Sequence, residues 1–280
     1  MILVVLTTFR SEGTMYDNRL LTKLATNKTS LGLFINSPDM VDLCGHLGFD
    51  WFVIDQMWTG NDWSRTEELI RAGEAAGITP IVRVAGNPWL GYDHQLALDC
   101  SRALGIGAQF VFVSHSCKKE IDECLQVSKD WHRKIMSIHP YNDFSDWVPV
   151  RDKHEAQTYV VPQPETRGAL DDLEAVIKTP GIKLVFIAMT DASRVLTGQH
   201  TPDFYHDEVW EYVDRAVALG KEYGVTIGAN TSYAYSLDEI ANRVRKLNEH
   251  GVRMIMVQTA SFLFQITMNK WLREFDSMRA

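Results

Sequence analysis

Two acidic side chains, each placed after an apolar run rich in β-branched residues, are the strongest candidates for chemistry in this sequence. Glu165 lies in residues 163–167 (QPETR), and Asp191 closes residues 185–191 (VFIAMTD). Such runs are typical of buried strands, so we expect each carboxylate at a strand end. Two protein carboxylates leave most of an octahedral shell to water and substrate, which is the arrangement that Mg²⁺ or Mn²⁺ prefers.

Other polar side chains follow the remaining predicted strands and would meet these acids at one end of a barrel. They are Asn36, Asp55, Arg83, His115, Gln163, Asn230 and Gln258. Arg83 suits an anionic oxygen, whereas Asp55 is either a site residue or a hydrogen-bond partner at the barrel mouth. The set contains no cysteine and no paired histidines suited to zinc. An open metal shell facing an arginine suits a chelating 2-oxo acid.

The elements that must position these residues alternate regularly between strand and helix. Strands are predicted at residues 31–35, 51–55, 80–84, 110–113, 157–162, 183–188, 225–229 and 254–257, with a possible extra strand at 134–139. A single helix is expected at 167–178, a loop at 198–202 and a closing amphipathic helix at 262–276. About eight strand–helix units indicate an α/β fold, a (β/α)₈ TIM barrel of parallel strands, rather than an open doubly wound sheet. The carboxyl ends of such strands form the active-site rim.

Length, composition and charge limit the kind of protein. The chain has 280 residues, 45% of them hydrophobic, and a formal net charge of −8. We expect one barrel domain at 19–280 after an N-terminal extension at 1–18. The acidic balance disfavours nucleic acid and anionic membranes as partners. The apolar start of the chain is too short to span a bilayer and lacks signal-peptide features, so a cytoplasmic protein with reduced cysteines is predicted.

Four motifs, in order and with matching spacing, resemble those of one family. They are residues 50–55 (DWFVID), 80–84 (PIVRV), 163–167 (QPETR) and 185–191 (VFIAMTD). They look like successive motifs of the HpcH/HpaI aldolase/citrate lyase family, which includes the class II, metal-dependent pyruvate aldolases such as 4-hydroxy-2-oxoheptanedioate aldolase. The resemblance covers nearly the whole chain and implies a TIM barrel.

The resemblance also implies a role for each matching residue. Glu165 and Asp191 would hold the divalent metal, with Gln163 behind them. Arg83 would contact the 2-oxo oxygen and stabilise the enolate, and the backbone amides of Thr190 and Asp191 would receive the substrate carboxylate. Metal and guanidinium facing the oxygen where charge develops would stabilise the transition state more than the ground state. The family further implies a homohexamer in which the last helix is swapped between neighbours.

One position departs from the family pattern. After the second strand the family usually reads Asp-Gly-Glu-His, and its histidine, oriented by that aspartate, supports proton transfer; here the sequence continues from Asp55 to Trp58 as DQMW. Because an indole has no basic nitrogen, Trp58 cannot be a general base. A metal-bound water could move the proton, a displaced histidine such as His115 or His139 could serve, or the reaction could need no such base.

The sequence therefore predicts a lyase that uses Mg²⁺ or Mn²⁺ to cleave 4-hydroxy-2-oxo acids into pyruvate and an aldehyde. One alternative is an oxaloacetate decarboxylase or enolate-condensing enzyme, because loss of CO₂ generates the enolate directly; macrophomate synthase in this family decarboxylates first and then adds the enolate to an acceptor. Another is a non-catalytic barrel that binds a keto acid. Trp58 and other tryptophans of the mouth either pack under loops or contact an apolar substrate tail, and His200 is expected to be solvated.

Overall fold

A computed structural model describes residues 19–85, 95–115, 117–129, 152 and 156–279 of the chain. The N-terminal extension at 1–18, the possible strand at 134–139 and His139 lie outside these described residues. What the sequence predicts for these residues therefore stays a prediction.

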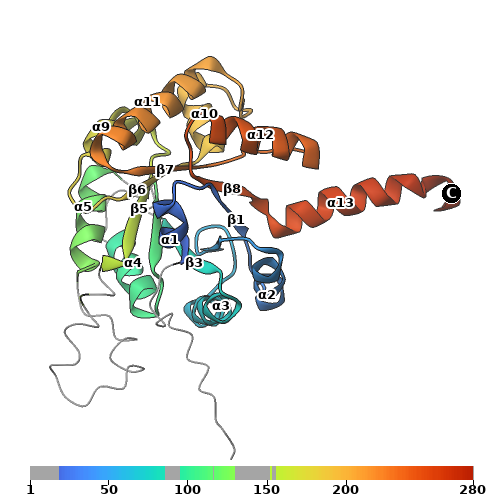
Figure 1. Ribbon diagram of the computed structural model, residues 1–280, viewed down its shortest axis with the longest axis horizontal. Coiled ribbons are helices and arrows are strands. Elements are labelled where there is room, and N and C mark those ends of the chain that lie inside the picture. The colour runs from blue at the N-terminus through green and yellow to red at the C-terminus, as the bar shows by residue number, and fades with distance from the viewer. Residues whose placement is uncertain (1–18, 86–94, 116, 130–151, 153–155, 280) are drawn as a thin grey trace, which may run out of the picture.

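Eight parallel strands form the centre of the molecule (Figure 1). Their hydrogen-bonded order is β5-β4-β3-β2-β1-β8-β7-β6, and β5 and β6 also lie against each other, so the sheet curls into a nearly closed barrel. The strands are β1 (Ser30–Phe34), β2 (Trp51–Asp55), β3 (Thr79–Ala85), β4 (Phe110–Ser114), β5 (Tyr159–Gln163), β6 (Leu184–Ile187), β7 (Thr226–Asn230) and β8 (Met254–Thr259). The predicted (β/α)₈ barrel is confirmed.

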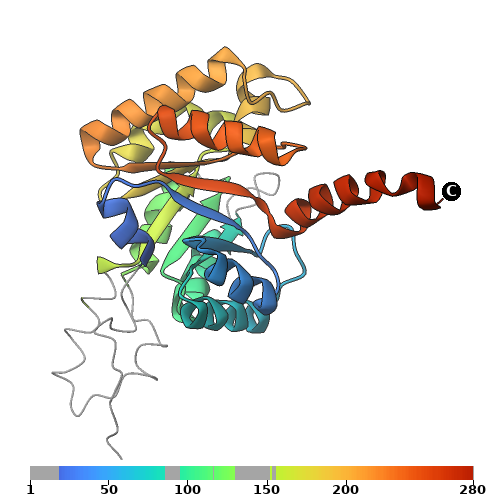
Figure 2. The ribbon, with the colours of Figure 1, turned by 45° about the vertical axis from the view of Figure 1, so that its right-hand side comes forward.

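Helices alternate with the strands, and most of them cover the outside of the barrel (Figures 1 and 2). They are α1 (Arg19–Ala25), α2 (Pro38–Leu47), α3 (Trp63–Ala76), α4 (Gln95–Gly105), α5 (Lys118–Val127), α8 (Arg167–Asp171), α9 (Leu173–Ile177), α10 (Met189–Thr197), α11 (Asp207–Tyr223), α12 (Leu237–Glu249), α13 (Ala260–Glu274) and α14 (Asp276–Arg279). Several boundaries follow ordinary capping rules. The Asp62 side chain accepts from the Arg65 amide at the start of α3, and Gly77 ends that helix in the left-handed conformation.

Two predicted elements after β5 and β6 are wrong. The single helix expected at 167–178 is two short helices, α8 and α9, interrupted at Asp172. Asp191 is expected at the end of a strand, but α10 begins at Met189, so Asp191 lies in the first turn of a helix. The residue preceding α10 is Ala188, which has no side-chain oxygen to cap the helix, and the start was therefore not visible as a capping signal.

Large side chains fill the inside of the barrel. Trp51, Phe112 and Phe186 are fully buried there, with ring centroids of Trp51 and Phe186 6.1 Å apart. Gly32 on the neighbouring strand leaves room for the indole, because a Cβ there would lie 2.2 Å from Trp51 Cδ2. Leu20 of α1 packs against the same cluster, and its amide donates to the Thr79 hydroxyl at the start of β3. The N-terminal end of the barrel is thus covered, and polar chemistry is left to the other end.

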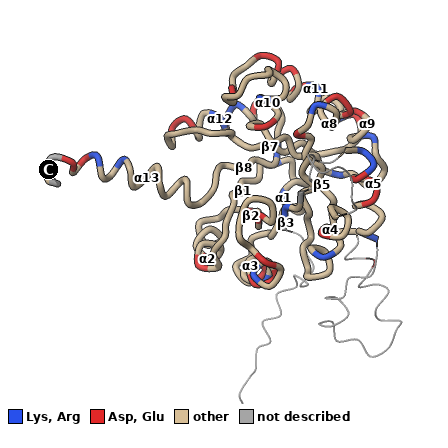
Figure 3. The backbone as a smooth tube through the Cα atoms, turned by 180° about the vertical axis from the view of Figure 1, so that it is seen from behind, with Lys and Arg blue, Asp and Glu red and all other residues tan. Residues whose placement is uncertain are grey.

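Charged residues of both signs are distributed over the outer helices, as the view from behind shows (Figure 3). Within the described residues no helix combines the length and apolar character needed to cross a membrane. Helix α13 differs from the other helices: it projects away from the barrel (Figures 1 and 2), has no buried residue, and carries no charged side chain before Lys270.

Candidate active site

A cavity of about 650 Å³ opens at the carboxyl ends of the strands. Seven residues to which the sequence assigned chemistry line it: Asp55, Trp58, Arg83, Gln163, Glu165, Thr190 and Asp191. Asn36, Asn230 and Gln258 line it as well. These side chains come from strands far apart in the sequence, and the barrel brings them to one mouth.

Glu165 is the buried acid of this cavity. It follows β5 and is 4% exposed, and its Oε2 accepts a hydrogen bond from the His115 amide at 3.2 Å. Burial, and after it the negative charge of Asp191, raises the pKa of Glu165 to about 8. Arg83 and the His115 amide act in the opposite direction. The metal-free site therefore carries a carboxyl group whose ionisation is opposed by its surroundings.

This donor set fits a divalent cation of the oxygen-binding kind. A cation between Glu165 and Asp191 would offset both the burial of the first carboxylate and its repulsion by the second. Among the described residues no three His, Cys, Asp or Glu side chains gather into a metal-binding group. The protein would supply two carboxylates, and water and substrate would complete the shell, as is usual for Mg²⁺ and Mn²⁺.

Arg83 is held in place by Asp55. The two residues are register partners on β3 and β2. Arg83 Nε donates to Asp55 Oδ1 at 3.0 Å and Nη2 donates to Oδ2 at 2.7 Å, while the guanidinium lies 4.7 Å from the centre of the Phe34 ring. Arg83 Nη1 has no hydrogen-bond partner in the part of the chain that the structure describes. Asp55 thus fixes one edge of the guanidinium and leaves the other edge for a ligand.

The first turn of α10 lies at the cavity with its backbone donors available. The Met189 amide donates to Asn230 Oδ1 at 2.9 Å, and the Thr190 hydroxyl donates to Ser232 Oγ at 3.1 Å. The amides of Thr190 and Asp191 meet no acceptor among the described residues. The first amides of a helix have no partner within the helix and favour an anionic group. Gln163, by contrast, is buried, and its Oε1 accepts from Ser114 Oγ.

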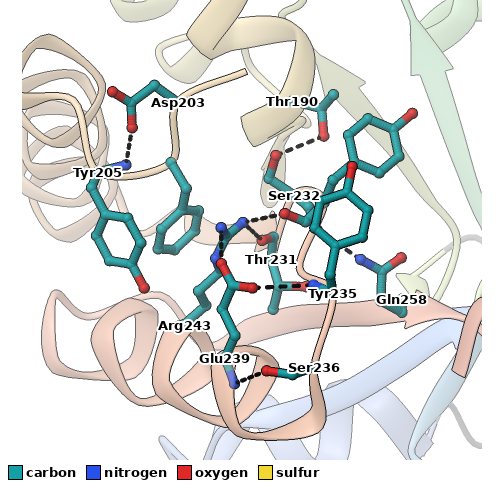
Figure 4. A network of polar contacts seen from close by, with 12 residues as sticks. Thr190, Asp203, Tyr205, Thr231, Ser232, Tyr235, Ser236, Glu239, Arg243 and Gln258 are labelled. Atoms are coloured by element: carbon teal, nitrogen blue, oxygen red, sulfur yellow. Dashed lines mark hydrogen bonds and ion pairs between the residues drawn. The ribbon is translucent and has the colours of Figure 1, made fainter. Parts of the chain in front are cut away.

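A buried arginine supports the part of the cavity wall that the loop after β7 forms, a feature that sequence reasoning missed (Figure 4). Arg243 Nη1 donates to the carbonyl oxygens of Thr231 and Tyr233 at 2.9 and 2.8 Å, and Nη2 pairs with Glu239. Its guanidinium also lies 4.6 Å from the centre of the Phe204 ring. Arg243 therefore ties the loop after β7 to the segment between α10 and α11. In the sequence it resembles an ordinary surface pair spaced i,i+4 with Glu239.

The structure separates the residues considered for proton transfer. Trp58 lines the mouth and is 74% exposed. His115 faces Glu165, with Nε2 3.5 Å from Oε2, and is not among the residues that line the cavity; burial lowers its pKa. His200 and Arg194 also line the cavity, although no local pattern in the sequence places either residue there.

A parallel barrel whose acids and arginine gather at the carboxyl ends of the strands has the architecture of (β/α)₈ barrel enzymes. Residues 30–260 match the model of the HpcH/HpaI aldolase/citrate lyase family, and the chain belongs to this family. The resemblance predicted from the four motifs is confirmed.

Individual relatives are distant. A 2-dehydro-3,6-dideoxy-6-sulfogluconate aldolase of Pseudomonas putida is 24% identical over 69% of this chain and 73% of its own length. A 5-keto-4-deoxy-D-glucarate aldolase of Shigella boydii serotype 18 is 23% identical over 75% of this chain and 82% of its own. The HpcH/HpaI aldolase structure from Desulfitobacterium hafniense DCB-2 aligns with a TM-score of 0.76 and 19% identity over 92% of this chain and 97% of that one, a likeness of fold alone. Together the family and these relatives support a lyase activity in general.

Proposed function

We propose that the protein is a divalent-metal-dependent carbon–carbon lyase that cleaves 4-hydroxy-2-oxo acids into pyruvate and an aldehyde. The observation that carries the proposal is the buried Glu165, whose pKa is raised to about 8 in a cavity that also holds Asp191 and Arg83. The two relatives are named as aldolases of sugar-derived acids, which agrees with this reaction class.

In this proposal Glu165 and Asp191 hold Mg²⁺ or Mn²⁺. When bound, the ion supplies positive charge that favours the enolate form of the product. Gln163 lies two residues before Glu165 and stays buried against Ser114, so it fixes the end of β5 from which Glu165 projects.

The remaining site residues bind and orient the 2-oxo acid. Arg83 Nη1 donates to the 2-oxo oxygen, where negative charge develops, and the paired Asp55 prevents the guanidinium from turning away. The amides of Thr190 and Asp191 receive the substrate carboxylate at the start of α10. Since the charge on the 2-oxo oxygen is largest in the transition state, Arg83 contributes more there than in the ground state.

The test is metal binding together with product formation. Titration calorimetry with Mn²⁺ should give one site in the wild type and none in Glu165→Gln or Asp191→Asn, whereas the exposed variant Glu222→Gln should bind as the wild type does. Pyruvate release from 4-hydroxy-2-oxo acids should require the metal and be lost with EDTA. A protein that binds no Mn²⁺ or Mg²⁺, or whose two variants retain the site, would overturn the proposal.

A second candidate function is favoured by Trp58. Its exposed indole stands at the mouth where the family pattern has a histidine, and it can neither accept nor return a proton. Decarboxylation of oxaloacetate, alone or followed by condensation of the enolate, needs no base at that point. Release of CO₂ from oxaloacetate that is much faster than aldol cleavage would select this candidate. Metal and keto-acid binding with neither reaction would select a non-catalytic binding barrel.

We further propose that the chain assembles as a homo-oligomer, a hexamer by analogy with the family. The support is α13, which extends from the barrel with no buried residue and exposes Phe264 and Trp271. Such a helix gains stability only when another surface covers its apolar side chains. We also propose that the substrate is a small-molecule 2-oxo acid and that the protein is cytoplasmic.

A further inference from the structure

Arg194 is a cavity-lining arginine that the chemistry described so far does not use. It belongs to α10, one turn after Asp191, and its side chain is 48% exposed. Its Nη1 lies 3.9 Å from Asp191 Oδ1, which is too far for a hydrogen bond. In the described part of the chain Arg194 has no other polar partner. Its donors therefore remain available to a molecule in the cavity.

The structural explanation for Arg194 is weak. Half-exposed ion pairs spaced i,i+3 on a helix contribute little to stability. Moreover, a cation bound by Asp191 would take up much of the carboxylate charge that now faces Arg194. An arginine that lines a cavity shared with three acids, Asp55, Glu165 and Asp191, instead provides a local site for a negative group.

The position of Arg194 along α10 indicates which negative group it would meet. The carboxylate next to the 2-oxo group already has the amides of Thr190 and Asp191 in the first turn, and Arg83 is committed to Asp55 and the 2-oxo oxygen. Arg194 lies a turn further along the helix, and His200 from the following segment lines the same cavity. Both line the cavity from positions that follow Asp191 in the sequence.

We propose that Arg194 binds an acidic group at the far end of the substrate and so makes the enzyme prefer 4-hydroxy-2-oxo acids with an anionic tail. This inference rests on the proposed aldolase function for the location of the substrate. The planar guanidinium, with two parallel donors, suits a tail carboxylate. Arg194 would thus select the aldehyde half of the substrate, while Arg83 acts on the pyruvate half.

The experiment compares substrates that differ only in the tail. Wild type, Arg194→Gln and Arg194→Lys are assayed with Mn²⁺ for pyruvate release from 4-hydroxy-2-oxoheptanedioate, which has a tail carboxylate, and from 4-hydroxy-2-oxohexanoate, which has none. The control is Arg245→Gln, an exposed arginine of α12 outside the cavity lining. We expect R194Q to lower kcat/KM for the diacid about 10- to 100-fold, mainly through KM, and to leave the monoacid unchanged. R194K should keep part of the preference, because it retains the charge and loses the planar fork.

Binding gives a readout that does not depend on cleavage. Calorimetry with 2-oxoadipate and 2-oxohexanoate, which differ in a terminal carboxylate and a terminal methyl, should show tighter binding of the diacid to wild type and no such difference in R194Q. If R194Q lost affinity equally for both ligands, Arg194 would lie at the 2-oxo acid end that the ligands share, and the inference would be overturned. An unchanged affinity for both ligands would also overturn it. If the wild type cleaves neither substrate but binds the diacid through Arg194, the proposed function is wrong. The inference that Arg194 binds the acidic tail would then still hold.

Discussion

At the scale of single residues, the site depends on one buried carboxyl group. Glu165 is almost fully covered, close to Asp191, and its pKa is raised from 4.5 to about 8. A protonated Glu165 in the metal-free protein and an ionised one beside a cation are two states of the same site. The first state has a measurable effect on stability.

We predict that the metal-free protein loses stability as pH rises towards 8. The folded protein keeps a proton on Glu165 that the unfolded chain releases above about pH 4.5, so the free energy of unfolding falls between these values, by up to about 1.4 kcal/mol per pH unit. Above about pH 8 this decline ends. Urea unfolding in EDTA at pH 6 to 9 measures it. Glu165→Gln should remove this component while Glu222→Gln keeps it; parallel curves for wild type and E165Q would contradict the prediction.

We also predict that Trp58→His raises aldol cleavage. The indole is exposed at the mouth, so an imidazole can replace it without disturbing the core, and a general base contributes about 10²- to 10⁴-fold when it is well placed. The measurement is kcat for pyruvate release, with oxaloacetate decarboxylation as the comparison that should not gain. If W58H binds Mn²⁺ normally but shows no increase, the missing base is not what limits aldol cleavage.

At the scale of elements, two loops of the cavity are fixed by a side chain on the outer layer. Arg243 in α12 is 8% exposed and bonds to carbonyl groups of the loop after β7, while Phe204 and Tyr205 stack on its guanidinium (Figure 4). The cavity wall thus depends on packing between α12 and the segment before α11.

Replacing Arg243 should therefore affect both stability and the site. Arg243→Met leaves two carbonyl groups without their donor and Glu239 without its cation, and we expect a loss of about 1–3 kcal/mol in the free energy of unfolding. Arg243→Lys should lose less stability and show mainly a raised KM for the 2-oxo acid. Chemical denaturation and steady-state kinetics test this, with the exposed Arg245→Gln as control. A stability loss below about 1 kcal/mol in R243M would show that the network is not structural.

The sequence predicted the strands well and the cavity wall poorly, for a physical reason. Strand positions follow from local apolar runs that end at polar residues, as at Asp55 and Gln163. Such a run predicts a strand without any information on tertiary contacts. Helix α10 has no polar N-cap, and Arg243 packs against Phe204 and Tyr205, which are distant in sequence. Local patterns thus suggested the two acids as metal-binding candidates, and the family resemblance suggested the amides that would bind the substrate carboxylate. The residues that shape the rest of the cavity depend on tertiary contacts.

At the scale of the whole molecule, α13 is the part that a single chain leaves incomplete. It projects from the barrel (Figure 2), and its apolar residues include Phe264, 64% exposed, and Trp271, 53% exposed. A monomer with this helix would expose an apolar surface to water. Assembly with other copies of the chain would cover it.

We predict that charges on this helix abolish assembly. The double variant Phe264→Glu/Trp271→Glu should shift the molar mass measured by light scattering from an oligomer to a monomer, because a buried interface does not accommodate unpaired carboxylates. The double variant Gln265→Glu/Asn269→Glu adds the same charge at exposed polar positions of α13 and should remain assembled. A wild type that is monomeric at micromolar concentration would contradict the prediction directly.

The close fit of Gly32 against Trp51 inside the barrel has an evolutionary consequence. Because a methyl group at position 32 would lie 2.2 Å from the indole, a larger residue at position 32 requires the indole to move or to be replaced by a smaller side chain. We expect the two positions to covary among homologues, with a larger residue at position 32 accompanied by a smaller one at position 51. Lineages that keep the indole should keep the glycine.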